Sequence, residues 1–157
     1  MIRTIILMII LLSFCGKSFS QQGFNTEKKD SSNVYHFALI KYCDYLDKIK
    51  NETRLIYVEN NFLITGNLPN KIKDHVIKYL DKGELKSHLM KHDKITLIRI
   101  VPLRVKGNDI FVNVIPFNVT YKKRNFKYVN GGGLGIKFEF DFKTNGLIFK
   151  SSEYGGI

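Results

Sequence analysis

The chain has 157 residues, with 25 Lys and Arg against 14 Asp and Glu, and only two Cys. This length fits one domain with a core of its own, and the formal net charge of +11 predicts a well-solvated surface or an anionic partner. Because the basic residues are scattered and the first residues predict export, we do not expect nucleic acid as the partner.

The N-terminal segment, residues 1–20, predicts a secretory signal peptide that is removed. Arg3 precedes an unbroken apolar run over residues 5–12, and Ser18-Phe19-Ser20 supplies the small side chains that cleavage requires. The apolar run is shorter than the ~20 residues that span a bilayer, so we expect no transmembrane helix. The mature chain would begin at Gln21 and be periplasmic or secreted.

Cys15 gives an alternative location. It follows Leu-Ser-Phe, as in a possible bacterial lipoprotein site, where a lipid on the cysteine would anchor the protein to a membrane. Such a site takes a small residue before the cysteine, and Phe14 is bulky, so the sequence favours cleavage after Ser20. Only Cys43 would then remain. It permits no intramolecular disulfide, and its place in a predicted helix indicates a buried, inert thiol.

Residues 21–33 predict a flexible polar lead-in, and residues 34–157 a single α+β domain. Apolar residues spaced three and four apart over Val34–Lys50 predict an amphipathic helix, with Asn33 among the residues that could cap it. Such a helix needs an apolar surface to pack against.

Two further elements are expected before the sheet. Residues 54–65 predict a short hairpin around Asn60-Asn61, because Asn tolerates the positive φ of a tight turn. Residues 70–92 show helical spacing, with Gly83 dividing the helix into two pieces.

The chain after Lys94 predicts an antiparallel sheet, because short turns such as Gly107-Asn108 and Asn145-Gly146 join its apolar runs. The fold class expected is therefore α+β: N-terminal helices and a short hairpin followed by a curved antiparallel sheet of about five strands, with the helices packed on one face. The strands are expected at residues 95–105, 109–121, 126–130, 135–143 and 147–149.

Strict alternation within residues 135–143 predicts a core row. Ile136, Phe138, Phe140 and Phe142 share one face of the strand, and charged residues occupy the other face. We expect Phe140, in the middle of the aromatic part, to be core.

His88 and His92 are candidate metal ligands. They stand four residues apart in a predicted helix, so both rings would share a face. A site needs at least one more ligand, which His75 or Asp93 could supply. Leu85 and Leu89 lie on the same face and favour the alternative, in which the two histidines lie at the edge of a packed surface.

Arg99 is the candidate ligand-binding residue. It interrupts the apolar face of a predicted strand, where a guanidinium needs an anionic partner to offset its desolvation. It could bind a carboxylate or phosphate ligand in a pocket. It could instead pair with Glu139, Asp141 or Glu153, or face solvent if Pro102 marks a bulge that shifts the register.

The function expected from these observations is an exported, non-catalytic binding module for a protein or a small anionic ligand in the cell envelope. One alternative is a small envelope hydrolase or lyase that uses a sheet cavity, with Arg99 and a His or an acid as working groups. Another is an inhibitory or immunity-type envelope protein. No motif implies a cofactor. A pocket around Arg99 would favour a ligand or substrate, and an exposed apolar patch would favour a protein partner.

Overall fold

The computed structural model describes residues 33–50, 52–107, 109–143 and 146–155. The predicted signal peptide, Cys15, the lead-in up to residue 32, and the turn residues Asn108 and Asn145 lie outside the described residues. Within the described part, no helix is long and apolar enough to cross a membrane.

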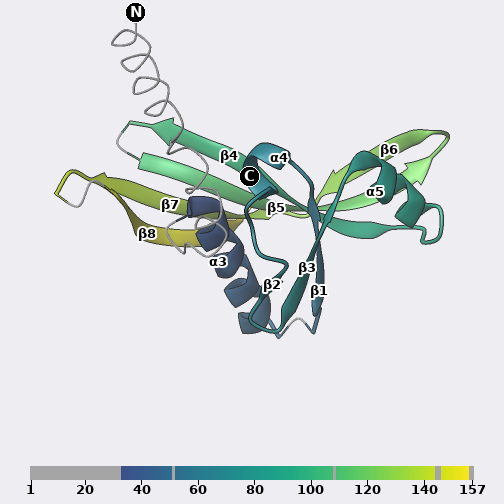
Figure 1. Ribbon diagram of the computed structural model, residues 1–157, viewed down its shortest axis with the longest axis horizontal. Helices are drawn as coiled ribbons and strands as arrows, with labels where there is room; N and C mark the ends of the chain where they lie inside the picture. The colour runs from purple at the N-terminus through teal and green to yellow at the C-terminus, as the bar shows by residue number, and fades with distance from the viewer. Residues whose placement is uncertain (1–32, 51, 108, 144–145, 156–157) are drawn as a thin grey trace, which may run out of the picture. The chain divides into compact units, whose positions relative to one another are not determined.

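Eight strands of the described chain form one open sheet in the order β2-β3-β1-β4-β5-β7-β8, with β6 paired to β5 (Figure 1). β1 is parallel to both β3 and β4, and the other pairs are antiparallel. The α+β class is confirmed, with more strands than the sequence predicts. The elements are α3 (Val34–Lys48), β1 (Leu55–Glu59), α4 (Phe62–Thr65), β2 (Lys71–Ile72), β3 (His75–Leu80), α5 (Lys82–Leu89), β4 (Ile95–Lys106), β5 (Asp109–Lys122), β6 (Asn125–Asn130), β7 (Gly133–Asp141) and β8 (Gly146–Gly155).

β5 is the branch point of the sheet. One edge of β5 pairs with β4. On the other edge, residues 109–114 pair with β7 and residues 117–122 pair with β6. The fork lies at Pro116, whose carbonyl accepts a hydrogen bond from the Gly131 N–H. A single long strand therefore belongs to both branches of the sheet.

The helices do not share one face of the sheet, which corrects the prediction. Ile98 and Ile100 of β4 pack in the core that α3 covers, whereas Leu97 packs in a second core with Leu85 and Leu89 of α5. Neighbouring residues of a strand point to opposite faces. α3 and α5 therefore cover opposite faces, and the sheet is buried on both sides where the two cores overlap along β4.

The predicted hairpin at residues 54–65 is wrong in its second half. β1 forms as a strand, but Phe62–Thr65 is a helical turn. Asn61 has an extended backbone and caps this turn, because its side chain accepts a hydrogen bond from the Leu63 N–H. Phe62 and Leu63 are 80% and 89% exposed, so they do not serve as strand residues of the core.

The predicted helix at residues 70–92 is also wrong over its first half. Burial in β3 alternates, with His75 and Ile77 buried and Val76 exposed, which is the period of a strand. The helix begins only at Lys82, where Asp81 and Glu84 form a reciprocal capping box. Gly83 lies in the first turn of this helix and does not divide it into two pieces, contrary to the prediction.

The row of apolar residues on β7 is core only over part of its length. Ile136 and Phe138 are buried, and Phe37 of α3 packs edge-on against Phe138 with ring centroids 5.7 Å apart. Phe140 is half-buried and Phe142 is 89% exposed, so the expected core position of Phe140 is wrong.

Two details complete the core and the edge of the sheet. Cys43 is fully buried, and burial raises the pKa of its thiol to about 12, in agreement with an inert thiol.

The β7–β8 ladder shifts register where Lys137 pairs with Ser151 and Phe138 pairs with Phe149. Lys150 is the extra residue of this bulge.

Candidate functional site

The connections after β1 and β3 create the candidate site. These neighbouring strands are parallel, so their carboxyl ends lie at the same edge. The chain leaves β1 into α4, whose Ile64 packs in the α3 core, and leaves β3 into α5 on the other face. Parallel strands whose following segments diverge to opposite faces leave a crevice outside their carboxyl ends, where open α/β sheets bind ligands.

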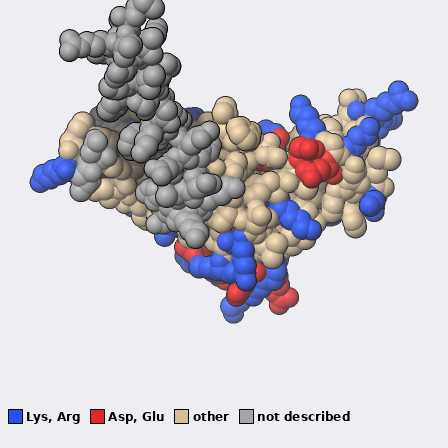
Figure 2. All heavy atoms as spheres, viewed as in Figure 1, with Lys and Arg blue, Asp and Glu red and all other residues tan. Residues whose placement is uncertain are grey.

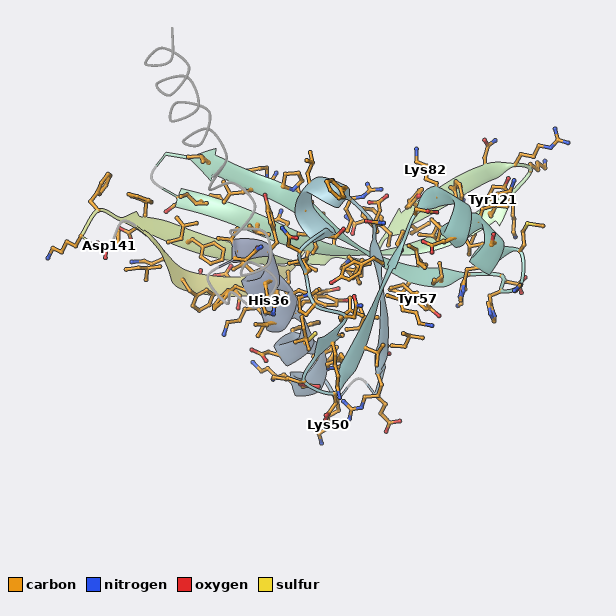
Figure 3. All side chains as sticks on the ribbon, viewed as in Figure 1. His36, Lys50, Tyr57, Lys82, Tyr121 and Asp141 are labelled. Carbon is orange, nitrogen blue, oxygen red and sulfur yellow. The ribbon has the colours of Figure 1, made fainter. Side chains whose placement is uncertain are left out.

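A crevice of about 510 Å³ occupies this position. Its walls come from the ends of β1 and β3, the start of α5, and the middle of β4. Figure 3 labels Lys82 at the start of α5 and Tyr57 in β1. The lining residues are Glu59, Asn60, Asn61, Phe62, Thr65, Leu80, Asp81, Lys82, Leu85, Arg99, Ile100, Pro102 and Tyr128.

Arg99 lies in the crevice and is paired with Glu59. The parallel ladder aligns Val58 with Ile98, so the next residues of β1 and β4 are side by side. Arg99 donates from Nε to one carboxylate oxygen of Glu59 and from Nη2 to the other, at 3.0 Å. This bidentate contact raises the pKa of Arg99. The two side chains are 41% and 29% exposed, so the pair is open to solvent and to a ligand.

Two aromatic rings hold the guanidinium in place. The Cζ atom of Arg99 lies 4.9 Å from the ring centroid of Phe117 and 5.4 Å from that of Tyr128. Burial raises the pKa of the Tyr128 phenol, and the nearby Glu59 carboxylate raises it further. These cation–π contacts fix Arg99 independently of Glu59.

Other polar side chains of the lining form hydrogen bonds within the segments that line the crevice. The Asp81 side chain accepts from the Glu84 N–H at 2.8 Å, and the Asp81 N–H in turn donates to the Glu84 carboxylate at 2.9 Å. The Thr65 hydroxyl donates toward Asn60 and Asn61 of the β1–α4 loop. Two acids, Glu59 and Asp81, face two bases, Lys82 and Arg99, so the lining carries no net formal charge.

The acidic partner of Arg99 differs from the three that the sequence suggests. Glu139, Asp141 and Glu153 lie on β7 and β8, whereas the partner is Glu59 at the end of β1. The register shift that Pro102 suggested lies between Val101 and Arg104, after Arg99. Arg99 therefore keeps the side of β4 that Leu97 occupies. Only the parallel pairing of β1 with β4 identifies Glu59, and no local sequence pattern signals that pairing.

His88 and His92 share one side of the α5 region, as their spacing predicts. Their ring centroids are 4.6 Å apart, and His88 also contacts Tyr57 at 4.9 Å. Burial lowers the pKa of His88, and a positive His92 lowers it further. His75 is engaged elsewhere, with Asp47 and the Thr53 carbonyl. Among the described residues, no group of three or more His, Cys, Asp or Glu could hold a metal ion.

Comparison of the chain with protein-family models, with curated proteins and with solved structures gives no match. The crevice and the charged groups in its walls are therefore the features that bear on function.

Proposed function

We propose that this chain is an exported, non-catalytic binding module, and that the crevice at the carboxyl ends of β1 and β3 holds a small ligand through an anionic group on Arg99. The observation that carries the proposal is the Arg99–Glu59 pair in the wall of a crevice of about 510 Å³. The size and the mixture of aromatic, apolar and a few convergent polar groups are typical of small-molecule sites.

The charge balance of the crevice supports a more specific ligand. A purely anionic ligand on Arg99 would displace Glu59 and leave that carboxylate without its partner, a free-energy cost that solvent reduces because both side chains are partly exposed. A ligand with both a carboxylate and an ammonium group replaces each partner at once. We therefore propose a small zwitterion, such as an α-amino acid with an apolar side chain that fits against Tyr128 and Leu80.

The lining supports binding rather than catalysis. Among the described residues of the crevice there is no His, Cys or Ser. Glu59 is paired with Arg99, and Asp81 is part of the capping box, so both carboxylates have a structural partner. The hydrolase or lyase alternative uses Arg99 with a His or an acid, and a general base must be free to move a proton. No His lines the described crevice, and its two acids are engaged by Arg99 and by the capping box.

A protein partner is a second candidate, and the exposed side chains on α4 favour it. Phe62 lines the crevice and Leu63 follows it, and both are at least 80% exposed. An apolar pair beside a polar crevice could receive a side chain of a bound protein segment. Phe62→Ser would strongly weaken the binding of a protein partner, and it would weaken the binding of a free amino acid only slightly.

Three related probes test the small-ligand proposal. L-phenylalanine carries both charges, N-acetyl-L-phenylalanine carries only the carboxylate, and L-phenylalanine amide carries only the ammonium group. We expect the zwitterion to bind best by calorimetry or by shifts of crevice amides in NMR. Arg99→Met should abolish its binding, because the carboxylate loses its donor pair.

Glu59→Gln is the matched variant. It removes the carboxylate that an anionic probe must displace, so the acetylated probe should bind this variant more tightly than it binds the unmodified chain. If the acetylated probe binds the unmodified chain as well as the zwitterion does, the ligand is a simple anion and the zwitterion proposal is wrong. If none of the three causes shifts in crevice amides, the small-ligand proposal for amino acids fails.

A further inference from the structure

The tip of the β5–β6 hairpin carries cations that no acidic group balances. Lys122, Lys123, Arg124 and Lys127 are exposed, and none forms an ion pair with a described residue. The chain from residue 110 to residue 138 contains no Asp or Glu. Elsewhere on the described surface six Lys and Arg form ion pairs with acids, among them Lys73 and Lys150.

The turn at this tip has two cationic residues in a strained backbone conformation. Lys123 and Arg124 have φ values of 51° and 65°, so two consecutive side-chain-bearing residues are left-handed. Asn-Gly makes a two-residue turn of this kind with much less strain. Backbone strain of this kind is found most often at functional positions, which directs attention to what these two cationic side chains contact.

The tip also extends past the rest of its sheet. The last pair between β4 and β5 is Ile95 with Val119, so residues 120–127 continue as a two-stranded projection (Figure 1). Just behind the turn, Tyr121 and Phe126 are cross-strand neighbours with ring centroids 4.9 Å apart, and they tie the hairpin to the core of Leu85 and Leu89. Tyr121 is labelled in Figure 3, and Figure 2 shows blue Lys and Arg atoms at this end of the molecule.

We propose that this hairpin tip, residues 122–127, binds a membrane surface that contains anionic phospholipid. Clustered, unpaired cations at a projecting tip are attracted to the negative surface potential of such a membrane. A linear polyanion such as a nucleic acid is better served by cations along a groove, with aromatic faces free for stacking. Here the cations are gathered at one projecting point, which favours contact with a surface. The proposal does not depend on the ligand of the crevice.

The decisive variant is Lys123→Asn with Arg124→Gly. It removes two cations and relieves the left-handed strain, so binding and stability should change in opposite directions. Binding to phosphatidylcholine vesicles that contain phosphatidylglycerol should fall by about 25-fold, at about fivefold per basic residue. The midpoint of thermal unfolding should rise. Vesicles of phosphatidylcholine alone should bind neither form.

Two controls separate the tip from the overall charge. Lys71→Gln with Lys143→Gln removes the same charge from exposed positions elsewhere, and it should weaken vesicle binding by less than about twofold. Lys122→Gln with Lys127→Gln leaves the turn residues in place and should weaken binding as the decisive variant does. Equal losses in the tip variants and the Lys71/Lys143 control would overturn the proposal. Tip-dependent binding to heparin or a polynucleotide, without binding to the vesicles, would also overturn it.

Discussion

A cluster of charged and polar side chains lies at each end of the parallel strands β1 and β3. One cluster is filled, because protein atoms surround it, and the other borders an open crevice. At the amino end, His75 is fully buried; its Nδ1 is 2.9 Å from the Thr53 carbonyl and its Nε2 is 2.9 Å from an Asp47 carboxylate oxygen of α3. At the carboxyl end, Arg99 and Glu59 remain partly exposed on a crevice of about 510 Å³.

The difference separates a structural hydrogen-bond cluster from a candidate binding site. Both ring nitrogens of His75 are engaged by protein atoms, and Lys73 and Arg54 complete the surroundings of Asp47. That cluster joins α3 to the sheet and leaves no buried polar group for a ligand. The Arg99–Glu59 pair has open space beside it. A ligand in that space can therefore replace the contacts between the two side chains with contacts of its own. Residue type alone does not distinguish the two.

The largest expected effect is at the filled cluster. His75→Ala removes a fully buried ring together with its contacts to Asp47 and the Thr53 carbonyl, so we expect the free energy of unfolding to fall by about 3 kcal/mol. Chemical denaturation at neutral pH measures it. His92→Ala, at an exposed position, should cost under about 0.5 kcal/mol. Equal costs would contradict the structural role of His75.

A smaller effect at the same cluster should depend on pH. The hydrogen bond from His75 lowers the pKa of Asp47, and Lys73 lowers it further. A depressed carboxyl pKa stabilises the fold above the unfolded value of about 3.9, and this contribution is lost as pH falls through the folded pKa. Asp47→Asn should therefore be less stable than the unmodified chain at pH 7, with the difference shrinking below about pH 4. A difference that is constant with pH would contradict this.

The smallest effect on stability is expected at the open pair. Arg99→Met removes an ion pair that solvent partly screens, and it keeps most of the packing against Phe117 and Tyr128. The free energy of unfolding should therefore change by under about 1 kcal/mol. The same denaturation experiment applies. A loss of about 3 kcal/mol or more would place this pair with His75–Asp47 as a structural contact and remove the basis for a ligand at Arg99.

The elements that the sequence predicts well have long, regular patterns. α3 shows helical spacing over four turns, and β4 and β5 are long apolar runs joined by a turn, so each was predicted nearly to its bounds. The short elements failed. In residues 70–80 the apolar positions suit a helix as well as a strand, and only pairing with β1 makes β3 a strand.

The candidate site was predictable only in part. Arg99 is conspicuous because it interrupts an apolar face, and the crevice does contain it. Glu59 lies 40 residues away and Tyr128 comes from β6, and both are brought to Arg99 by strand order rather than by any local signal. The crevice itself depends on α4 and α5 lying on opposite faces, whereas the sequence predicted helices on a single face.

The bulge at Lys150 has a consequence for solubility. β8 is the outer strand at one end of the sheet order, and ten residues of exposed strand edge are a template for pairing with another chain. An extra residue kinks the strand and increases its twist, and a charged side chain at the kink makes a flat match with a second edge unfavourable. The kink at Lys150, whose ammonium pairs with Glu139 of β7, therefore makes β8 a poor template for a second chain while β8 stays paired with β7.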